Sequence, residues 1–256
     1  MQKLTIKNRQ GEKIAVAVEA AESQRGLAFV MHGLGGFKEQ PHIQTFARAF
    51  KNNGYTVVLF DATNSIAESD GKLEDATLTN YYEDLEDVIG WAGEQSFYEE
   101  PFILVGHSLG SMAIALYAEK YPQKVKALAP VSTVVSGELL EQTPDFKKIG
   151  QAWQEKGVRE WESSSRPGVM KRLNWSHVLD IRKYNLLPQA GKLTMPVLLL
   201  VGDQDEVTPL EHQKLLYEKL PGRKELRIVK GAPHTFLARE HLEEVKEIMR
   251  RWVEGI

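Results

Sequence analysis

The sequence contains no cysteine, which removes several chemistries at once. Without a thiol the chain can form neither a disulfide nor a thiolate metal site, and cysteine catalysis is excluded. Long hydrophobic runs are missing too, because no stretch approaches the roughly 18 apolar residues that a transmembrane helix needs. The first ten residues, MQKLTIKNRQ, lack the apolar core of a signal peptide. We therefore expect no membrane span and a cytoplasmic location.

The chain also lacks a large excess of either sign of charge. The formal net charge is −3, and no basic run is long enough to form a stripe along the surface. This balance argues against nucleic acid or an anionic membrane as the main partner and favours a small molecule. The histidines show no H-E-x-x-H spacing, so we expect no metal site. Nothing in the sequence indicates an oligomeric state.

A sizeable core is present, since 42% of the 256 residues are hydrophobic, and residues 1–256 are expected to form one domain. Short apolar runs alternate with amphipathic stretches of helical period, a pattern typical of an α/β fold with a mostly parallel sheet. The runs predict strands at residues 4–7, 13–18, 27–31, 56–60, 102–105, 125–131, 197–201 and 226–229. The amphipathic stretches predict helices at residues 43–51, 80–93, 111–120, 210–220 and 237–252. The turn sequence NRQGE between the first two strands predicts an antiparallel hairpin.

The alternation stops between about residues 135 and 190, where no run looks like a strand. We interpret this segment as a helical insertion, with Thr143 as a helix N-cap and Gly157 as its stop. Three of the chain's five tryptophans lie there, namely Trp153, Trp161 and Trp175. Large aromatic side chains of this kind either pack a small separate core or line a substrate pocket. The sequence favours the first role and leaves the second open.

The segment ILVGHSLGSMAIA contains the pattern G-x-S-x-G around Ser108. A buried strand runs into the pattern, and a helix rich in small residues runs out of it. Such a sharp turn forces the serine into a positive-φ conformation, while Gly106 and Gly110 let the strand and helix approach closely. Its hydroxyl then projects into open space, so Ser108 is a candidate nucleophile.

A serine nucleophile needs a base, and the base needs a group that fixes its tautomer. Asp203 and Asp205 follow the strand predicted at residues 197–201, and His234 follows the last predicted strand. Their order along the chain, serine, aspartate and then histidine, is the order that this strand-turn-helix arrangement uses.

The glycine-rich segment HGLGG, residues 32–36, could bind a phosphate or an oxyanion. A dinucleotide fingerprint would need a third glycine where Lys38 stands, and no Gly-Lys-Ser/Thr follows for a P-loop. Beside a serine nucleophile, the segment is better interpreted as an oxyanion loop. The N–H of Leu34 would be one donor, and the N–H of Leu109 after the nucleophile would be the other.

These motifs together resemble the α/β-hydrolase superfamily, and within it the small cytoplasmic serine esterases, including cinnamoyl (feruloyl) esterases and monoacylglycerol lipase-like enzymes. The resemblance rests on HGLGG, GHSLG, MPVLLLVGDQDEVTP and GAPHTF, and covers nearly the whole chain. It implies the α/β-hydrolase fold, with a mostly parallel eight-stranded sheet and a helical cap at residues 135–190. It also implies that Asp205, the last residue of G-x-x-D, is the catalytic acid, with Asp203 as the second candidate. No cofactor is implied.

One departure from the family pattern occurs in FDATNSIAESDG, where Asn64 and Ile66 stand at positions normally held by glycine. We expect this change to affect the loop rather than the catalytic residues. Asp61, at the end of the preceding strand, is expected to hold the loop by hydrogen bonds. His32 and His107, beside the glycines of the two motifs, are expected to be structural.

The resemblance implies a serine carboxylesterase that hydrolyses small acyl esters, with a short-chain or aromatic acyl group, through an acyl-enzyme. The same residues could also serve a monoacylglycerol lipase, a thioesterase or an acyltransferase. A non-catalytic binding protein of this fold is disfavoured, because serine, aspartate and histidine are all present. The tryptophans of the insertion are the candidate substrate contacts.

Overall fold

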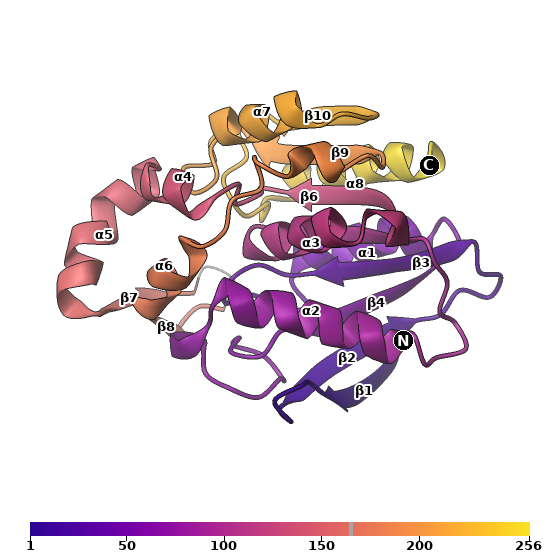
Figure 1. Ribbon diagram of the computed structural model, residues 1–256, viewed down its shortest axis with the longest axis horizontal. Coiled ribbons are helices and arrows are strands. Elements are labelled where there is room, and N and C mark those ends of the chain that lie inside the picture. Colours follow the sequence, from indigo (N-terminus) through magenta and orange to yellow (C-terminus); the bar gives the residue numbers. More distant parts are fainter. Residues whose placement is uncertain (164–165) are drawn as a thin grey trace.

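The computed structural model describes residues 1–163 and 166–256. Within these residues, one sheet of eight strands lies at the centre of the molecule, in the order β1-β2-β4-β3-β5-β6-β9-β10 (Figure 1). The strands are β1 (Gln2–Lys7), β2 (Lys13–Glu19), β3 (Gly26–Met31), β4 (Tyr55–Asp61), β5 (Phe102–His107), β6 (Val125–Val131), β9 (Val197–Gly202) and β10 (Lys224–Val229). β2 pairs antiparallel with both β1 and β4, and every pair from β4 to β10 is parallel. All eight predicted strands and the predicted hairpin are confirmed.

Helices cover both faces of this sheet (Figure 1). They are α1 (Pro41–Lys51), α2 (Leu78–Ala92), α3 (Leu109–Lys120), α7 (Leu210–Lys219) and α8 (Arg239–Glu254), with short 3₁₀ turns η1 (Leu73–Asp75) and η2 (Pro122–Lys124). Because helices cover both faces, β3, β4, β5 and β9 are buried along their whole length, which explains their continuous apolar sequences. The five predicted helices are confirmed to within a few residues.

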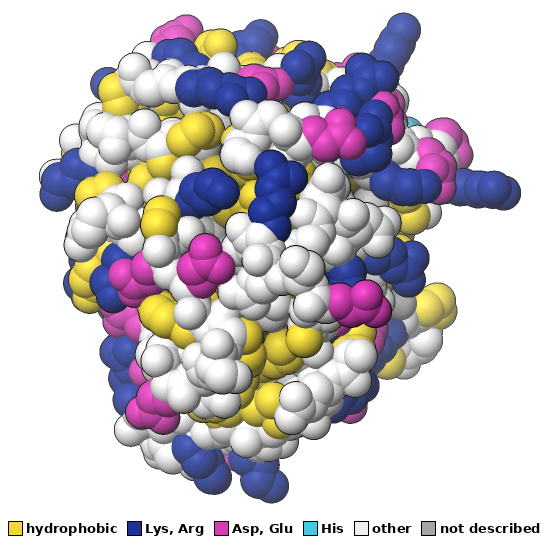
Figure 2. Space-filling model, turned by 90° about the vertical axis from the view of Figure 1, so that its right-hand side faces the viewer, with side chains coloured by type: hydrophobic (Ala, Val, Ile, Leu, Met, Phe, Trp, Pro, Cys, Tyr) yellow, Lys and Arg dark blue, Asp and Glu magenta, His cyan; other side chains and the backbone are white. Residues whose placement is uncertain are grey.

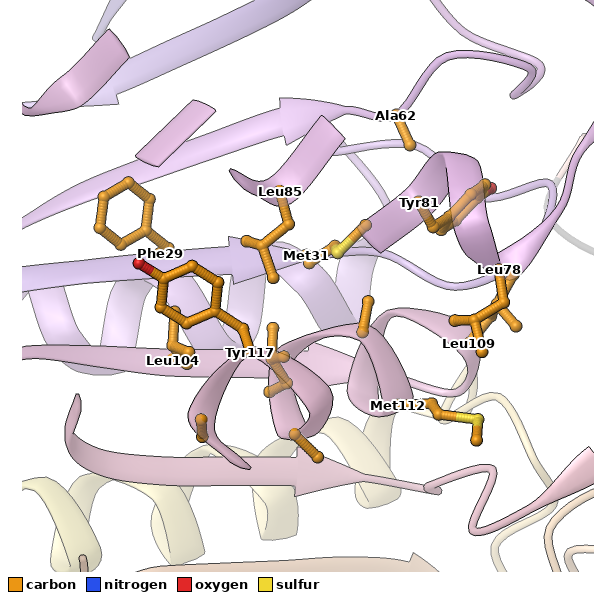
Figure 3. Packing of buried hydrophobic residues seen from close by; sticks show 14 of the residues in the cluster. Phe29, Met31, Ala62, Leu78, Tyr81, Leu85, Leu104, Leu109, Met112 and Tyr117 are labelled. Carbon is orange, nitrogen blue, oxygen red and sulfur yellow. The ribbon is translucent and has the colours of Figure 1, made fainter. Parts of the chain in front are cut away.

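The hydrophobic core has one part on each face of the sheet. On one face, Phe29 of β3 and Leu104 of β5 point toward Leu85 of α2 and Tyr117 of α3 (Figure 3). On the other face α1 packs against α8, so that Phe50 meets Trp252 edge to face with ring centroids 6.4 Å apart. Side chains that interlock on both faces hold the strand ends in fixed positions.

The segment between β6 and β9 forms a cap at one end of the sheet (Figure 1). It contains α4 (Gly137–Glu141), α5 (Pro144–Lys156), β7 (Val158–Glu162), β8 (Met170–Asn174), α6 (Ser176–Ile181) and the turn η3 (Ala190–Lys192). The expectation of an insertion without strands was wrong, because β7 and β8 pair as an antiparallel hairpin. Their sequences, VREWE and MKRLN, are mostly polar, since one side of the hairpin faces outward, and so they lack the apolar run that marks a buried strand.

Helix α5 begins and ends where the sequence predicted. The side chain of Thr143 accepts a hydrogen bond from the N–H of Phe146, and Gly157 ends the helix with a φ of 71°. Trp153 and Trp175 meet edge to face with centroids 5.5 Å apart, and Trp153 is almost fully buried. The predicted separate core was wrong, because Trp153 belongs to the buried cluster on the α2 and α3 face of the sheet and Trp175 packs against that cluster. Trp161 is only half-buried and, together with Trp153, lines an open cleft of about 540 Å³.

The opposite end of the molecule, away from the cap, has a mixed surface. Lysine and arginine side chains are interspersed there with acidic and polar ones (Figure 2). Across the described ranges, no helix is both long enough and apolar enough to cross a membrane.

Candidate active site

Ser108 lies at the sharp turn between β5 and α3, with φ 56° and ψ −117°. The two flanking glycines are required by close backbone contacts. A Cβ on Gly106 would lie 2.7 Å from the carbonyl oxygen of Gly110, and one on Gly110 would lie 2.3 Å from that of His32. The strained, positive-φ turn predicted from G-x-S-x-G is therefore present, and it places the serine hydroxyl at the carboxyl end of the sheet.

The loops after β9 and β10 bring the other two predicted side chains to Ser108. The Oγ of Ser108 lies 2.9 Å from Nε2 of His234. Nδ1 of His234 lies 2.9 Å from Oδ2 and 3.1 Å from Oδ1 of Asp205. Because the Asp205 carboxylate can only accept, Nδ1 carries the proton and Nε2 is free to accept the proton of the serine hydroxyl. This is the geometry of an activated nucleophile.

Asp205 is held as a carboxylate by its surroundings. It accepts hydrogen bonds from the N–H of Val207, at 2.9 Å, and from the N–H and hydroxyl of Thr208, at 2.8 and 2.7 Å. Burial alone would raise the pKa of Asp205, but His234 and these donors hold it well below its usual range. Thr208 was not identified from the sequence; an aspartate three residues before a threonine, a common turn arrangement, was its only signal.

Asp203 is excluded from this network by the direction of the loop. Its Oδ1 accepts a hydrogen bond of 2.7 Å from the N–H of Gly231, and its side chain is exposed. The two candidate aspartates thus have different positions, with Asp205 beside His234 and Asp203 fastening the loop after β9 to the turn after β10.

The predicted oxyanion loop passes directly beside Ser108. A Cβ on Gly33 would lie only 3.0 Å from Cβ of Ser108, so the loop can approach because glycine stands there. Among residues 1–163 and 166–256, the N–H groups of Leu34 and Leu109 donate to no protein acceptor. They are therefore available to an oxygen bound beside the serine, and Leu109 is also the first residue of α3, where the helix dipole favours negative charge.

Buried polar contacts fix the shape of this loop. Tyr81 of α2 accepts from the N–H of Gly35 and donates to the carbonyl of Gly33, both at 3.3 Å. Nε2 of His32 accepts from the N–H of Ala62 at 3.0 Å, which leaves Nδ1–H to donate to the carbonyl of Gly33 at 2.7 Å. The expected structural role of His32 is consistent with these contacts.

Asp61 holds the next part of the loop, as expected. Its carboxylate accepts from the N–H of Lys38 at 2.7 Å and from the Lys38 ammonium at 2.5 Å. The same ammonium reaches Glu68 at 2.5 Å, although Lys38 itself is 2% exposed. This buried ion pair ties the loop after β3 to the end of β4.

His107 anchors the loop that carries His234. Burial, and secondarily the nearby His234, lowers the pKa of His107 to about 3, so its ring is neutral. Its Nε2 lies 2.9 Å from the carbonyl oxygen of His234, to which it donates. His107 therefore positions His234 through the backbone, in agreement with the structural role expected for it.

The space next to Ser108 is a small cavity of about 60 Å³. It is lined by the predicted oxyanion loop, by the turn at Ser108, by the loop that carries His234 and by Lys171 of the cap hairpin. Lys171 has no local sequence signature, because its approach to the cavity depends on how the hairpin docks. No group of three or more histidine, aspartate or glutamate side chains able to hold a metal ion occurs in the part of the chain that the structure describes.

A family model described as the alpha/beta hydrolase fold matches residues 29–165, more than half of the 256 residues. The chain belongs to the alpha/beta hydrolase family. A second model, described as serine aminopeptidase S33, matches residues 172–241. The mostly parallel eight-stranded sheet covered by helices agrees with the fold of this family.

Two curated proteins are similar to this chain at low sequence identity. The chain is 31% identical over 159 residues to the mitochondrial palmitoyl-protein thioesterase ABHD10 of Bos taurus, a match that covers 62% of this chain and 50% of that protein. The matched part thus spans half the length of that relative. An uncharacterized 31.7 kDa protein of Escherichia coli is 25% identical, with 95% of both chains covered.

A solved structure shows the same fold over almost the whole chain. Est1E from Butyrivibrio proteoclasticus, determined with ferulic acid bound, superposes with a TM-score of 0.81, 23% identity and 98% coverage of both chains. Family membership, together with esterase-like and thioesterase relatives, supports a hydrolase activity for this chain.

Proposed function

We propose that the protein is a serine hydrolase that cleaves small carboxylic esters through an acyl-enzyme intermediate. The observation that carries the proposal is the unbroken hydrogen-bond path from Ser108 Oγ, through the His234 ring, to the Asp205 carboxylate. A binding protein would have no use for a serine held in a strained turn and hydrogen bonded to an oriented histidine.

In the first half-reaction, Ser108 Oγ attacks the ester carbonyl carbon while Nε2 of His234 takes the hydroxyl proton. The carbonyl electrons move to oxygen, and the N–H groups of Leu34 and Leu109 stabilise the resulting oxyanion. Collapse of this intermediate breaks the bond to the alcohol, which leaves with the proton from His234. In the second half-reaction a water molecule attacks the acyl-enzyme in the same way and releases the carboxylic acid.

The size of the cavity supports a short acyl group. Pockets for drug-sized ligands occupy roughly 300–1,000 Å³, whereas the space at Ser108 is about 60 Å³. A short-chain acyl group therefore fits this cavity best.

A thioester is the main alternative substrate, favoured by the likeness to a palmitoyl-protein thioesterase. The same attack on the carbonyl carbon would then expel a thiol instead of an alcohol. The cytoplasmic location stays a prediction, since that relative is named as mitochondrial. Monoacylglycerol lipase and acyltransferase activities require, respectively, a longer acyl site and an alcohol acceptor, and remain lesser alternatives.

The test compares the wild type with Ser108→Ala on p-nitrophenyl esters from acetate to palmitate, methyl ferulate and matched acyl thioesters. We expect turnover of short esters, and a loss of kcat on the order of 10⁶ in the variant, as removal of a serine nucleophile produces elsewhere. A fluorophosphonate probe should label the wild type and not the variant. Equal rates in the two proteins, or no labelling of the folded wild type, would refute the proposal.

A further inference from the structure

Lys171 is a buried cation at the edge of the Ser108 cavity. Its side chain is on β8 of the cap hairpin, and the residue is 7% exposed. Among the residues that the structure describes, no carboxylate forms an ion pair with its ammonium and no acceptor receives a hydrogen bond from it; the charged group that acts on it is Arg166. A buried charge in this position costs free energy unless something compensates it.

The hairpin register directs Lys171 inward. Lys171 pairs with Trp161 across the two strands, so both side chains lie on the same face of the hairpin, with the Lys171 Nζ 6.0 Å from the Trp161 ring centroid. The neighbours of Lys171 along β8, Met170 and Arg172, face the other way and are exposed. The inward direction is therefore built into the pairing of β7 with β8.

The ammonium reaches the cavity of Ser108. Lys171 lines this cavity together with Ser108, Leu34 and His234. Its Nζ lies 3.3 Å from the position that a Cβ on Gly35 would occupy, next to the oxyanion donor of Leu34. A group bound to Lys171 would consequently lie within a few bonds of an ester carbonyl on Ser108.

The carboxylates of the active site and of the loop that Lys38 anchors are already engaged. Asp205 is hydrogen bonded to His234 and Thr208, and Asp61 and Glu68 pair with Lys38. The second cation of the cap hairpin near the site, Arg166, stacks over the Phe37 ring at 3.9 Å. Burial, and then the proximity of Arg166, lowers the pKa of Lys171. An anion beside Lys171 would reverse this effect, and no protein group described in the structure is placed to supply one.

We propose that Lys171 binds a carboxylate of the substrate, so that the preferred substrates are short esters carrying a free carboxylate near the scissile carbonyl. The inference rests on the proposed function and narrows its substrate class. The carboxylate can belong to the acyl part, as in a monoester of a short dicarboxylic acid, or to the alcohol part, as in an ester of a short hydroxy acid. Lys171 is in both cases a specificity residue that contacts the substrate.

The experiment uses two pairs of esters that differ only in charge. p-Nitrophenyl hemisuccinate and its methyl ester test a carboxylate on the acyl part, and O-acetylglycolate and its methyl ester test one on the alcohol part. The proteins are the wild type, Lys171→Met, Lys171→Arg and the control Arg172→Met, which changes an outward side chain of the same strand. Hydrogen bonds to charged groups are worth enough to change kcat/KM roughly 10- to 100-fold.

We expect Lys171→Met to lower kcat/KM by that factor for the charged member of one pair and to change kcat/KM for its neutral methyl ester much less. Lys171→Arg should keep part of the preference, and Arg172→Met all of it. The pair that responds tells which part of the substrate carries the carboxylate. An equal fall for charged and neutral esters would overturn the inference, because Lys171 would then act on the oxyanion, and so would no change in either pair.

A binding measurement separates this inference from the proposed function. Calorimetry measures the binding of monomethyl succinate and of O-acetylglycolate to Ser108→Ala and to Ser108→Ala/Lys171→Met. Binding that is lost with Lys171 supports carboxylate recognition even if the wild type hydrolyses no ester and fluorophosphonate labels no serine. Equal binding, or no binding, by the two variants overturns it.

Discussion

Asp203 and Asp205 stand one residue apart in the sequence but have different surroundings. Asp205 is buried and receives donors from His234 and Thr208, whereas Asp203 is exposed and accepts from Gly231. Pattern alone pointed to both aspartates, and only the resemblance favoured the second. The turn that separates them is set by backbone hydrogen bonds, which the side-chain pattern does not encode.

We predict that Asp205→Asn lowers kcat for p-nitrophenyl acetate by about 10⁴, as loss of the orienting carboxylate does in another serine hydrolase. The neutral amide would favour the wrong tautomer of His234. Asp203→Asn is the matched control and should leave kcat nearly unchanged. The opposite ranking of the two variants would show that Asp205 does not orient the histidine.

The residues found from the sequence are those whose position follows from a local turn. Ser108, His234 and the loop around Leu34 each follow a predicted strand, and parallel strands end at the same edge of a sheet. Thr208 and Lys171 were missed. Thr208 contacts the site through its hydrogen bond to Asp205, and Lys171 reaches the cavity because the cap hairpin docks beside it. Contacts between segments far apart in the chain have no local signature.

Among the elements, the loop after β4 shows how one substitution of the family pattern is accommodated. Asn64 replaces an expected glycine and adopts a φ of 56°, in the left-handed region. Its Oδ1 accepts from the N–H of Lys72 at 3.0 Å, and its own N–H donates to Asp70 at 3.0 Å. Asparagine is among the residues that tolerate this conformation best. Asn64 therefore forms a positive-φ turn at a position where glycine was expected.

We predict that Asn64→Ala lowers the free energy of unfolding by about 1–3 kcal/mol, because alanine loses the side-chain acceptor and disfavours a positive φ. Asn64→Gly keeps the backbone freedom and loses only the acceptor, so it should cost less. Urea denaturation of the three proteins measures both effects. If alanine and glycine proved equally costly, backbone strain would not be the reason for asparagine at this position.

Apart from the partly exposed edge strands β1 and β10, the elements predicted correctly have both faces buried or a clear helical period. Strands β3 to β6 and β9 are covered by helices on both sides, which imposes long apolar runs. The hairpin of β7 and β8 has one exposed face and only five residues in each strand, so its alternation is hidden among charges. A short two-stranded ribbon is stabilised by what it packs against, which a local pattern cannot show.

A buried carboxyl group on α3 lowers the free energy of unfolding of the whole molecule. Glu119 is 7% exposed, and its Oε1 makes no hydrogen bond within the described chain. Burial raises the pKa of Glu119 from 4.5 to about 8, and Lys192 offsets this only in part. Between these two values the folded protein holds a proton at this site that the unfolded chain has lost. The free energy of unfolding therefore falls as the pH rises through this window.

We predict that Glu119→Gln removes most of this pH dependence and makes the protein more stable than the wild type at about pH 8, by on the order of 1–3 kcal/mol. The two proteins should have similar stability near pH 4.5, the unfolded value. Urea unfolding across the window measures the difference. Glu218→Gln, at an exposed position of α7, is the control; a parallel change in both variants would mean that Glu119 is not the cause.

The two ends of the cap lie side by side. The N–H of Leu186 donates to the carbonyl of Val135 at 2.9 Å, and the N–H of Gly137 donates to that of Tyr184 at 3.1 Å. The segment between them is thus a closed excursion, whose removal or exchange would not reroute any strand of the sheet. Mutation or recombination can therefore change residues 137–184 together, including Lys171 and Trp161, without changing Ser108, Asp205 and His234.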